Sequence, residues 1–189
     1  MGILNNNTTE IIVDKDILLK VVEPKDAEII FNTIDNEREY LKEWLPFVEE
    51  THDISYTKTF IEHTIAADSS DLTFTISYKN QFVGIIGLKD TDMGNRKTEI
   101  GYWLSEKFQH NGIVTRSCKA LIEYAFNDMN LHRIQLKTAT KNFKSQAVAE
   151  RLGFTLEGIE RDGELHSHGF VDLKVFSLLK EDRLNVSHI

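Results

Sequence analysis

The sequence predicts one α+β domain in which a mixed sheet is flanked by helices. A chain of 189 residues can bury one hydrophobic core but is short for two domains. Residues 72–104 contain three consecutive apolar segments separated by polar turns, which is typical of an antiparallel meander. Residues 114–126 then carry an apolar stripe of helical period, and more strand and helix patterns follow. Together these features favour a sheet with helices packed on it.

The N-terminal part of the chain predicts one strand followed by a helix. Residues 1–13 are polar, and we expect a frayed or edge-like segment there, ahead of a single domain spanning 14–189. Aliphatic residues predict a strand at 17–22, and Pro24 suits the first turn of the next helix. That helix has an apolar face at i, i+3, i+4, i+7 spacing, formed by Ala27, Ile30, Phe31 and Ile34.

Two shorter helices are expected before the meander. The first stops near Pro46 and carries Leu41, Trp44 and Leu45. The second begins near residues 53–55, and its expected buried side consists of Tyr56, Phe60 and Ile61. The meander that follows has predicted strands at 72–78, 82–88 and 98–104.

The helix at 114–126 has the strongest periodicity in the sequence. Its apolar side is formed by Val114, Cys118, Leu121, Ile122, Ala125 and Phe126. This stripe explains Cys118 as a packing residue. A strand at 133–139, a short helix ending at Gly153, and closing strands at 154–157 and 170–179 complete the predicted order.

Composition excludes several functional classes. The balance of 22 Lys+Arg against 30 Asp+Glu gives a net charge of -8, which argues against a nucleic-acid partner and fits a cationic one better. One cysteine excludes an internal disulfide and a multi-thiolate metal site. The first residues lack the regions of an export signal, and no apolar run approaches the roughly 18 residues that a membrane span needs. We therefore expect a cytoplasmic protein with no membrane or nucleic-acid partner.

The chemistry is concentrated in residues 102–115, where a strand, a short loop and a helix N-terminus follow one another. The first N–H groups of a helix have no internal partner and the helix dipole favours negative charge there, so this arrangement can bind an anion. Gly112 permits close approach of a ligand to the backbone. From the loop alone, an ordinary turn that needs Gly112 for a positive φ is an equal alternative. The pattern is neither a Walker loop nor a dinucleotide-binding fingerprint.

The motif Gln109-x-x-Gly112-x-Val114 resembles the acetyl-CoA signature Gln/Arg-x-x-Gly-x-Gly/Ala of the GCN5-related N-acetyltransferase (GNAT) superfamily, with Val114 at the position of a small residue. Three further segments resemble its ribosomal-protein N-acetyltransferase (RimJ/RimL) branch: 44–47, 99–104 and 142–154. The resemblance covers about residues 17–179. It implies the GNAT fold, a mostly antiparallel twisted sheet with splayed central strands, and transfer of acetyl from acetyl-CoA directly to an amine without a metal.

The resemblance also implies which residues contact acetyl-CoA. Backbone N–H groups of one loop hold the pyrophosphate, and this loop consists of Gln109, His110, Asn111, Gly112, Ile113, Val114 and Thr115. The strand edge formed by Tyr102, Trp103 and Leu104 pairs with pantetheine. Asn142 contacts pantetheine, and Ser145 donates a proton to the departing CoA thiolate. Helix capping is the ordinary explanation for both of these residues.

Two glutamates compete for the role of general base, because an ammonium cannot attack until it loses a proton. Glu164 aligns with the base of the Rim branch and would act through water. Glu99 matches the position of the base in other GNAT enzymes. A surface glutamate is the alternative for each. His166 and His168 lack a third ligand, which is typical of a solvated loop rather than a metal site.

Two kinds of acceptor fit the resemblance. The first is the N-terminal α-amine of a basic, ribosomal protein, and a homodimer is expected with it. The second is a small amine such as a polyamine, an amino acid or an aminoglycoside. Trp44 and Phe47 are core residues on an ordinary interpretation, but in the resembling family this region edges the acceptor slot. A non-catalytic acyl-CoA-binding module is a third reading, which the presence of Ser145, Glu99 and Glu164 disfavours.

Overall fold

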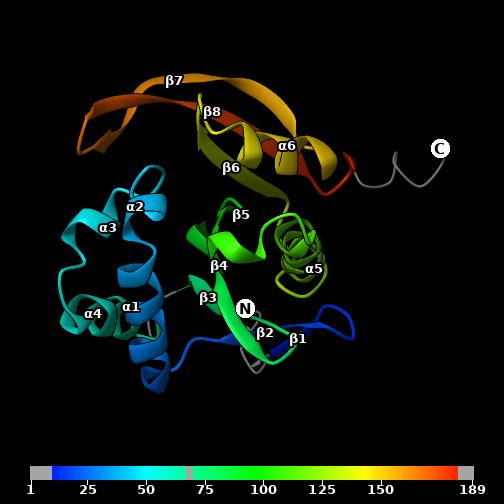
Figure 1. Cartoon of the computed structure of the whole chain (residues 1–189). Coiled ribbons are helices and arrows are strands. Elements are labelled where there is room, and N and C mark those ends of the chain that lie inside the picture. The colour runs from blue at the N-terminus through cyan, green and yellow to red at the C-terminus, as the bar shows by residue number, and fades with distance from the viewer. Residues whose placement is uncertain (1–9, 67–69, 183–189) are drawn as a thin grey trace.

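The computed structural model describes residues 10–66 and 70–182 (Figure 1). The strands are β1 (Glu10–Ile12), β2 (Ile17–Val21), β3 (Leu72–Tyr78), β4 (Gln81–Asp92), β5 (Lys97–Leu104), β6 (Arg133–Ala139), β7 (Thr155–His166) and β8 (Gly169–Leu179). The helices are η1 (Pro24–Asp26), α1 (Ala27–Asn36), α2 (Arg38–Leu41), α3 (Phe47–Glu50), α4 (Ile54–Thr64), η2 (Glu106–Phe108), α5 (Ile113–Asn127) and α6 (Phe143–Arg151). Within the described ranges, none of these helices is long and apolar enough to cross a membrane.

All the strands belong to one sheet, in the order β1-β2-β3-β4-β5-β6-β8-β7. Strand β1 pairs with β2 at the edge of the sheet, within the segment expected to be frayed or edge-like. Residues 1–9 of that segment lie outside the described residues. Neighbouring strands are antiparallel except β5 and β6, which are parallel. The mixed, mostly antiparallel sheet is therefore confirmed.

The central strands β5 and β6 separate soon after they meet. Their pairing extends only from Lys97↔Arg133 to Glu99↔Gln135. Beyond that point β5 stays paired with β4 on its other side, and β6 stays paired with β8. In Figure 1, β6, β8 and β7 turn away from the group β1–β5. The predicted splay is thus present, and it leaves the facing edges of 100–104 and 136–139 outside the sheet pairing.

Helices cover the two faces of the sheet, and each face has its own core. The main core combines β2–β6 and β8 with the apolar face of α5, including Cys118, Leu121 and Phe126. The second core lies under α1, α2, α3 and α4 and includes Ile85 and Trp103 from the sheet. Cys118 is fully buried in the main core, which confirms its interpretation as a packing residue.

The structure corrects two details of the helical layer. Helix α2 ends at Leu41, so Trp44 and Leu45 follow it in a turn. Tyr56 and Phe60 were expected to be buried, but they are 46% and 45% exposed. Helix α4 packs on α1, and it buries the i, i+4 pair Thr57 and Ile61. Docking on α1 therefore sets which face of α4 is buried.

Strand β7 is much longer than the predicted strand at 154–157. It pairs with β8 from Thr155 to His166, with register shifts between Leu156 and Gly158 and between Glu160 and Glu164. Residues 155–162 are all exposed, because β7 is an edge strand. No alternation of apolar and polar residues marks such a strand in the sequence. The extension brings Glu164 and His166 into the sheet.

Candidate active site

A cleft of about 880 Å³ opens where β5 and β6 diverge. Its walls come from β5, the loop before α5, the end of β6, the start of α6, and the distal part of β7. The turn after α2 contributes Trp44 and Leu45. All predicted site residues line this cleft except two, Asn111 and Phe47. Phe47 is exposed at the start of α3.

The loop before α5 is held from both sides by side-chain hydrogen bonds. The amide nitrogen of Gln109 donates to the Tyr40 hydroxyl, and Lys144 Nζ donates to Gln109 Oε1 at 2.8 Å. Asn111 turns back onto its own loop and donates to the carbonyl oxygens of Phe108 and Gln109, at 3.1 and 3.0 Å. The side chains of Gln109 and Asn111 therefore fix the loop conformation. The Gln109 N–H already donates to the Glu106 carbonyl oxygen at 3.1 Å, so any N–H groups open to a ligand follow it in the chain.

Gly112 begins α5 with a left-handed φ of 65°, which is the conformation that the ordinary-turn alternative required of it. No side chain caps this helix terminus. Its first-turn residues Ile113, Val114 and Thr115 line the cleft, so their N–H groups, which have no partner within the helix, lie at its wall. The partial positive charge of the α5 N-terminus therefore lies at the wall of the cleft.

Two cations of α6 were missed by the sequence interpretation. Lys144 and Arg151 both line the cleft beside the loop. Arg151 Nη1 donates to Thr115 Oγ1 at 2.5 Å, which joins α6 to the first turn of α5. Their seven-residue spacing places them on one face of α6, and this spacing was a readable signal. Together with the α5 terminus they make the mouth of the cleft suitable for phosphate groups.

Ser145 and Tyr102 form a hydrogen-bonded pair inside the cleft, with 2.8 Å between their hydroxyl oxygens. Burial raises the pKa of the Tyr102 phenol well above its ordinary value, so this hydroxyl keeps its proton. Asn142 Oδ1 accepts a hydrogen bond from the Ser145 N–H at 3.1 Å and so caps α6. Capping and cleft lining therefore coexist at these residues.

The next two residues of β5 are oriented differently from Tyr102. The Trp103 indole is buried in the second core and makes an edge contact with Phe82, with 5.9 Å between ring centroids. The Leu104 side chain belongs to the main core. Both residues line the cleft, so they present mainly backbone to it.

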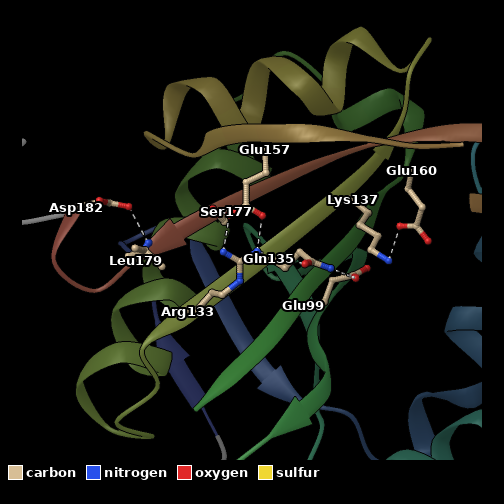
Figure 2. A network of polar contacts seen from close by, with 9 residues as sticks. All are labelled: Glu99, Arg133, Gln135, Lys137, Glu157, Glu160, Ser177, Leu179 and Asp182. Atoms are coloured by element: carbon tan, nitrogen blue, oxygen red, sulfur yellow. Dashed lines mark hydrogen bonds and ion pairs between the residues drawn. The ribbon is translucent and has the colours of Figure 1, made fainter. Parts of the chain in front are cut away.

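Glu99 is buried and engaged by two partners. Lys89 Nζ lies 2.9 Å from Glu99 Oε1, and Gln135 Nε2 donates to Oε2 at 3.2 Å. Figure 2 shows the Gln135 contact beside the ion pair of Lys137 with Glu160. The hydrogen bond to Glu160, and secondarily the charge of Glu99, raise the pKa of Lys137. Both Glu99 oxygens therefore have protein partners in a charged network.

Glu164 has a different environment. Its side chain is 38% exposed and lines the cleft, and its Oε2 lies 2.8 Å from His166 Nε2. The interpretation of residues 166–168 as a solvated loop is wrong for His166, whose side chain is 1% exposed. The extension of β7 buries it. Among the described residues, no three His, Cys, Asp or Glu side chains are grouped to hold a metal ion.

A family model described as the acetyltransferase (GNAT) domain matches residues 16–155. The chain belongs to the GNAT family. A Bacillus subtilis protein, YdaF, named provisionally as a ribosomal N-acetyltransferase, is 38% identical over 173 residues, which are 90% of this chain and 94% of YdaF. The ribosomal-protein-serine acetyltransferase of Escherichia coli is 26% identical over 175 residues, which cover 90% of this chain and 96% of that enzyme.

Solved structures agree with this assignment. The microcin C7 self-immunity acetyltransferase MccE, crystallised with acetyl-CoA and AMP, superposes with a TM-score of 0.85 at 29% identity, covering 92% of this chain and 97% of MccE. The GNAT fold and the resemblance to the RimJ/RimL branch are confirmed. The chain is an acetyl-CoA-dependent N-acetyltransferase, which sets aside the non-catalytic binding module.

Proposed function

We propose that this N-acetyltransferase acetylates the N-terminal α-amine of a protein, and that the acceptor is a basic ribosomal protein. The observation that carries the proposal is the charge of the cleft beside β7. Lys89 pairs with Glu99 and Lys137 with Glu160, so Asp90 and Glu164 remain as carboxylates that line this region. They attract an ammonium group, and the net charge of -8 favours a basic protein as its carrier. The near full-length similarity to YdaF supports the same acceptor class.

We propose that the pyrophosphate and pantetheine of acetyl-CoA lie in this cleft. The pyrophosphate would be held by the N–H groups of the loop and first turn at 110–115, since the Gln109 N–H is bonded to Glu106, and Lys144 and Arg151 would supply charge. Pantetheine would extend the sheet along β5 at 102–104, where β5 has no pairing with β6. The side-chain nitrogen of Asn142 would contact pantetheine, since the side-chain oxygen already caps α6.

The proposed reaction is a single direct transfer. The acceptor ammonium loses a proton to Glu164 through a water molecule, and the neutral amine attacks the thioester carbon. A C–N bond forms, the C–S bond breaks, and the thiolate takes a proton from Ser145. The second proton of the attacking nitrogen, lost as the amide forms, passes to the Ser145 oxygen and restores its hydroxyl. The Tyr102 hydroxyl, which burial keeps protonated by raising its pKa, holds the Ser145 hydroxyl in place through their hydrogen bond. Backbone N–H groups at the edge of β5 would stabilise the negative charge that develops on the thioester oxygen.

We propose Glu164, rather than Glu99, as the general base. Both oxygens of Glu99 have partners, and one partner is the cation Lys89. Only one oxygen of Glu164 has a described partner, and its side chain is more exposed. A carboxylate with an accessible oxygen can take a proton through water, which suits Glu164. Glu99 has no such oxygen, and we propose that it organises the network around Gln135 instead (Figure 2).

The decisive test measures CoA release and product masses with a panel of acceptors. Peptides that begin with Ser, Ala or Thr are compared with polyamines, free amino acids and aminoglycosides. We expect turnover with the peptides and modification at their α-amine. A second peptide set with a blocked N-terminus but free lysines is the control. Turnover confined to the small amines would overturn the protein-acceptor proposal while leaving the acetyltransferase assignment intact.

A small-amine acceptor is the second candidate. MccE, at 29% identity, was crystallised with AMP as well as acetyl-CoA, so a relative of this chain binds a small molecule together with the cofactor. The same acceptor panel separates the two candidates. A KM for a small amine far below that for every peptide would favour this alternative.

We also propose a homodimer of single-domain subunits. The hairpin of β7 and β8 lies at an edge of the sheet and exposes Leu156, Ile159, Leu165 and Phe170. An exposed apolar edge strand favours association. Light scattering during gel filtration measures the mass directly, and a monomer at micromolar concentration would contradict this proposal.

A further inference from the structure

We propose that His166 is a positioning residue for Glu164. In this arrangement the imidazole holds one carboxylate oxygen, and the other oxygen stays directed to the water and amine of the cleft. The inference rests on the proposed function, in which Glu164 is the general base. Nothing in the composition or the loop motif pointed to this pair, because β7 was predicted to end at residue 157.

The strand geometry places the two side chains together. Glu164 and His166 are two residues apart on β7, so they lie on the same face of the strand. The distance from His166 Nε2 to Glu164 Oε2 is 2.8 Å. Gly169 of β8 lies directly opposite His166 and has no side chain that could compete for the space of the ring. The ring is buried, whereas Glu164 still reaches the cleft.

The hydrogen-bonding pattern identifies which nitrogen of the His166 ring donates to Glu164. An ionised carboxylate only accepts hydrogen bonds, so Nε2 carries the proton and donates it to Glu164. His166 Nδ1 is buried and has no hydrogen-bond partner among the described residues. The Nε2 N–H is therefore the group that holds one oxygen of Glu164 and so positions the carboxylate.

A purely structural role would explain why the His166 ring is buried, but not why the buried side chain is polar. An apolar side chain would fill the same space without leaving a buried nitrogen unpaired. The ring contacts two titratable groups of the described chain, Glu164 and the exposed His168, whose centroid lies 5.4 Å away. Only Glu164 is hydrogen-bonded to it. The use of a polar ring at this position is thus accounted for by its contact with Glu164.

The test compares variants that keep or remove the donor. His166→Phe keeps a ring of similar size and lacks the donor, and we expect kcat with a peptide acceptor to fall about tenfold because the base loses its orientation. The KM for acetyl-CoA should stay within twofold of wild type. His166→Gln retains an amide donor and should recover most of the loss. His168→Asn is the matched control on the same turn, and its kcat should equal that of wild type.

A double-mutant cycle separates positioning from packing. In a Glu164→Gln background, His166→Phe should cause no further fall in kcat, because the group it positions is gone. If the two substitutions lower kcat by factors that multiply in the double variant, this inference is overturned and the assignment of Glu164 as the base stands. A wild-type kcat for Glu164→Gln would instead overturn the base assignment, and this inference with it. Thermal unfolding checks every variant, and His166→Asn, whose side chain is too short to reach Glu164, replaces His166→Phe if the latter does not fold.

Discussion

Replacing Gly84 with alanine is expected to disturb the β5 backbone, on which we propose that acetyl-CoA binding depends. Gly84 lies on β4 opposite Leu104. A Cβ added at Gly84 would lie 2.2 Å from the Trp103 carbonyl oxygen and 3.0 Å from the Leu104 Cα. Both are backbone atoms, so a change of rotamer cannot relieve the contact. Strand β5 would have to retreat by about 1 Å before these atoms reach van der Waals separation.

Two effects of known size follow from this displacement. Forcing an extra carbon into a packed region costs about 1–3 kcal/mol of the free energy of unfolding. For a chain of this length, each kcal/mol lowers Tm by about 2–4 °C. A shift of about 1 Å at a binding edge is enough to lower affinity or rate up to about a hundredfold. Gly84→Ala should therefore lower Tm by several degrees and weaken acetyl-CoA binding by at least about tenfold.

Calorimetry measures both quantities, with thermal scans for Tm and titration for the affinity for acetyl-CoA. Gly158→Ala on β7 is the matched control, because an added Cβ there meets no atom within 4 Å. The control should keep the wild-type affinity for acetyl-CoA. A Gly84→Ala variant with both the Tm and the affinity of wild type would refute the reasoning, since β5 would then have absorbed the added carbon without moving.

Three further predictions concern other parts of the molecule. Burial raises the pKa of the Cys118 thiol, so it should resist Ellman's reagent in the native protein and react within minutes in denaturant; rapid labelling of native protein would contradict its burial. Arg133 lowers the pKa of Glu157 from 4.5 to about 2. The Tm of wild type should therefore exceed that of Glu157→Gln by a full margin above pH 4.5, and this margin should vanish towards pH 2. A Tm difference that stays constant with pH would contradict this. Ser145→Ala should lower kcat about a hundredfold with an unchanged affinity for acetyl-CoA, and an unchanged kcat would remove Ser145 from its proposed role.

Local features of the chain were predictable from the sequence. The apolar stripe of α5 has a period that belongs to the helix itself, so its buried face could be predicted around Cys118 without knowledge of its neighbours. The left-handed φ of Gly112 is also a local property, because it depends on one residue at a strand-to-helix turn. The end of the cleft proposed to bind acetyl-CoA is built from these local features, and all but Asn111 of its predicted residues line the cleft.

The acceptor end depended on contacts between distant segments. The buried face of α4 is set by docking on α1, which a sequence window around Tyr56 and Phe60 does not contain. The length of β7 depends on its pairing with β8, and its exposed residues carry no alternating pattern. At the other end of the cleft, the seven-residue spacing of Lys144 and Arg151 was readable in the sequence, but their position beside the loop follows only from the placement of α6.

The sequence by itself therefore indicated the fold class, the family and the proposed cofactor loop, because each of these is encoded in local period, glycine conformation or a short motif. The tertiary structure alone decided the surroundings of the two candidate bases. Pairing with β8 carries Glu164 to the cleft with His166 buried beside it, whereas the contact of β5 with β6 places Glu99 against Gln135. A side chain's partners across a sheet follow from strand register, and register is a property of the folded chain.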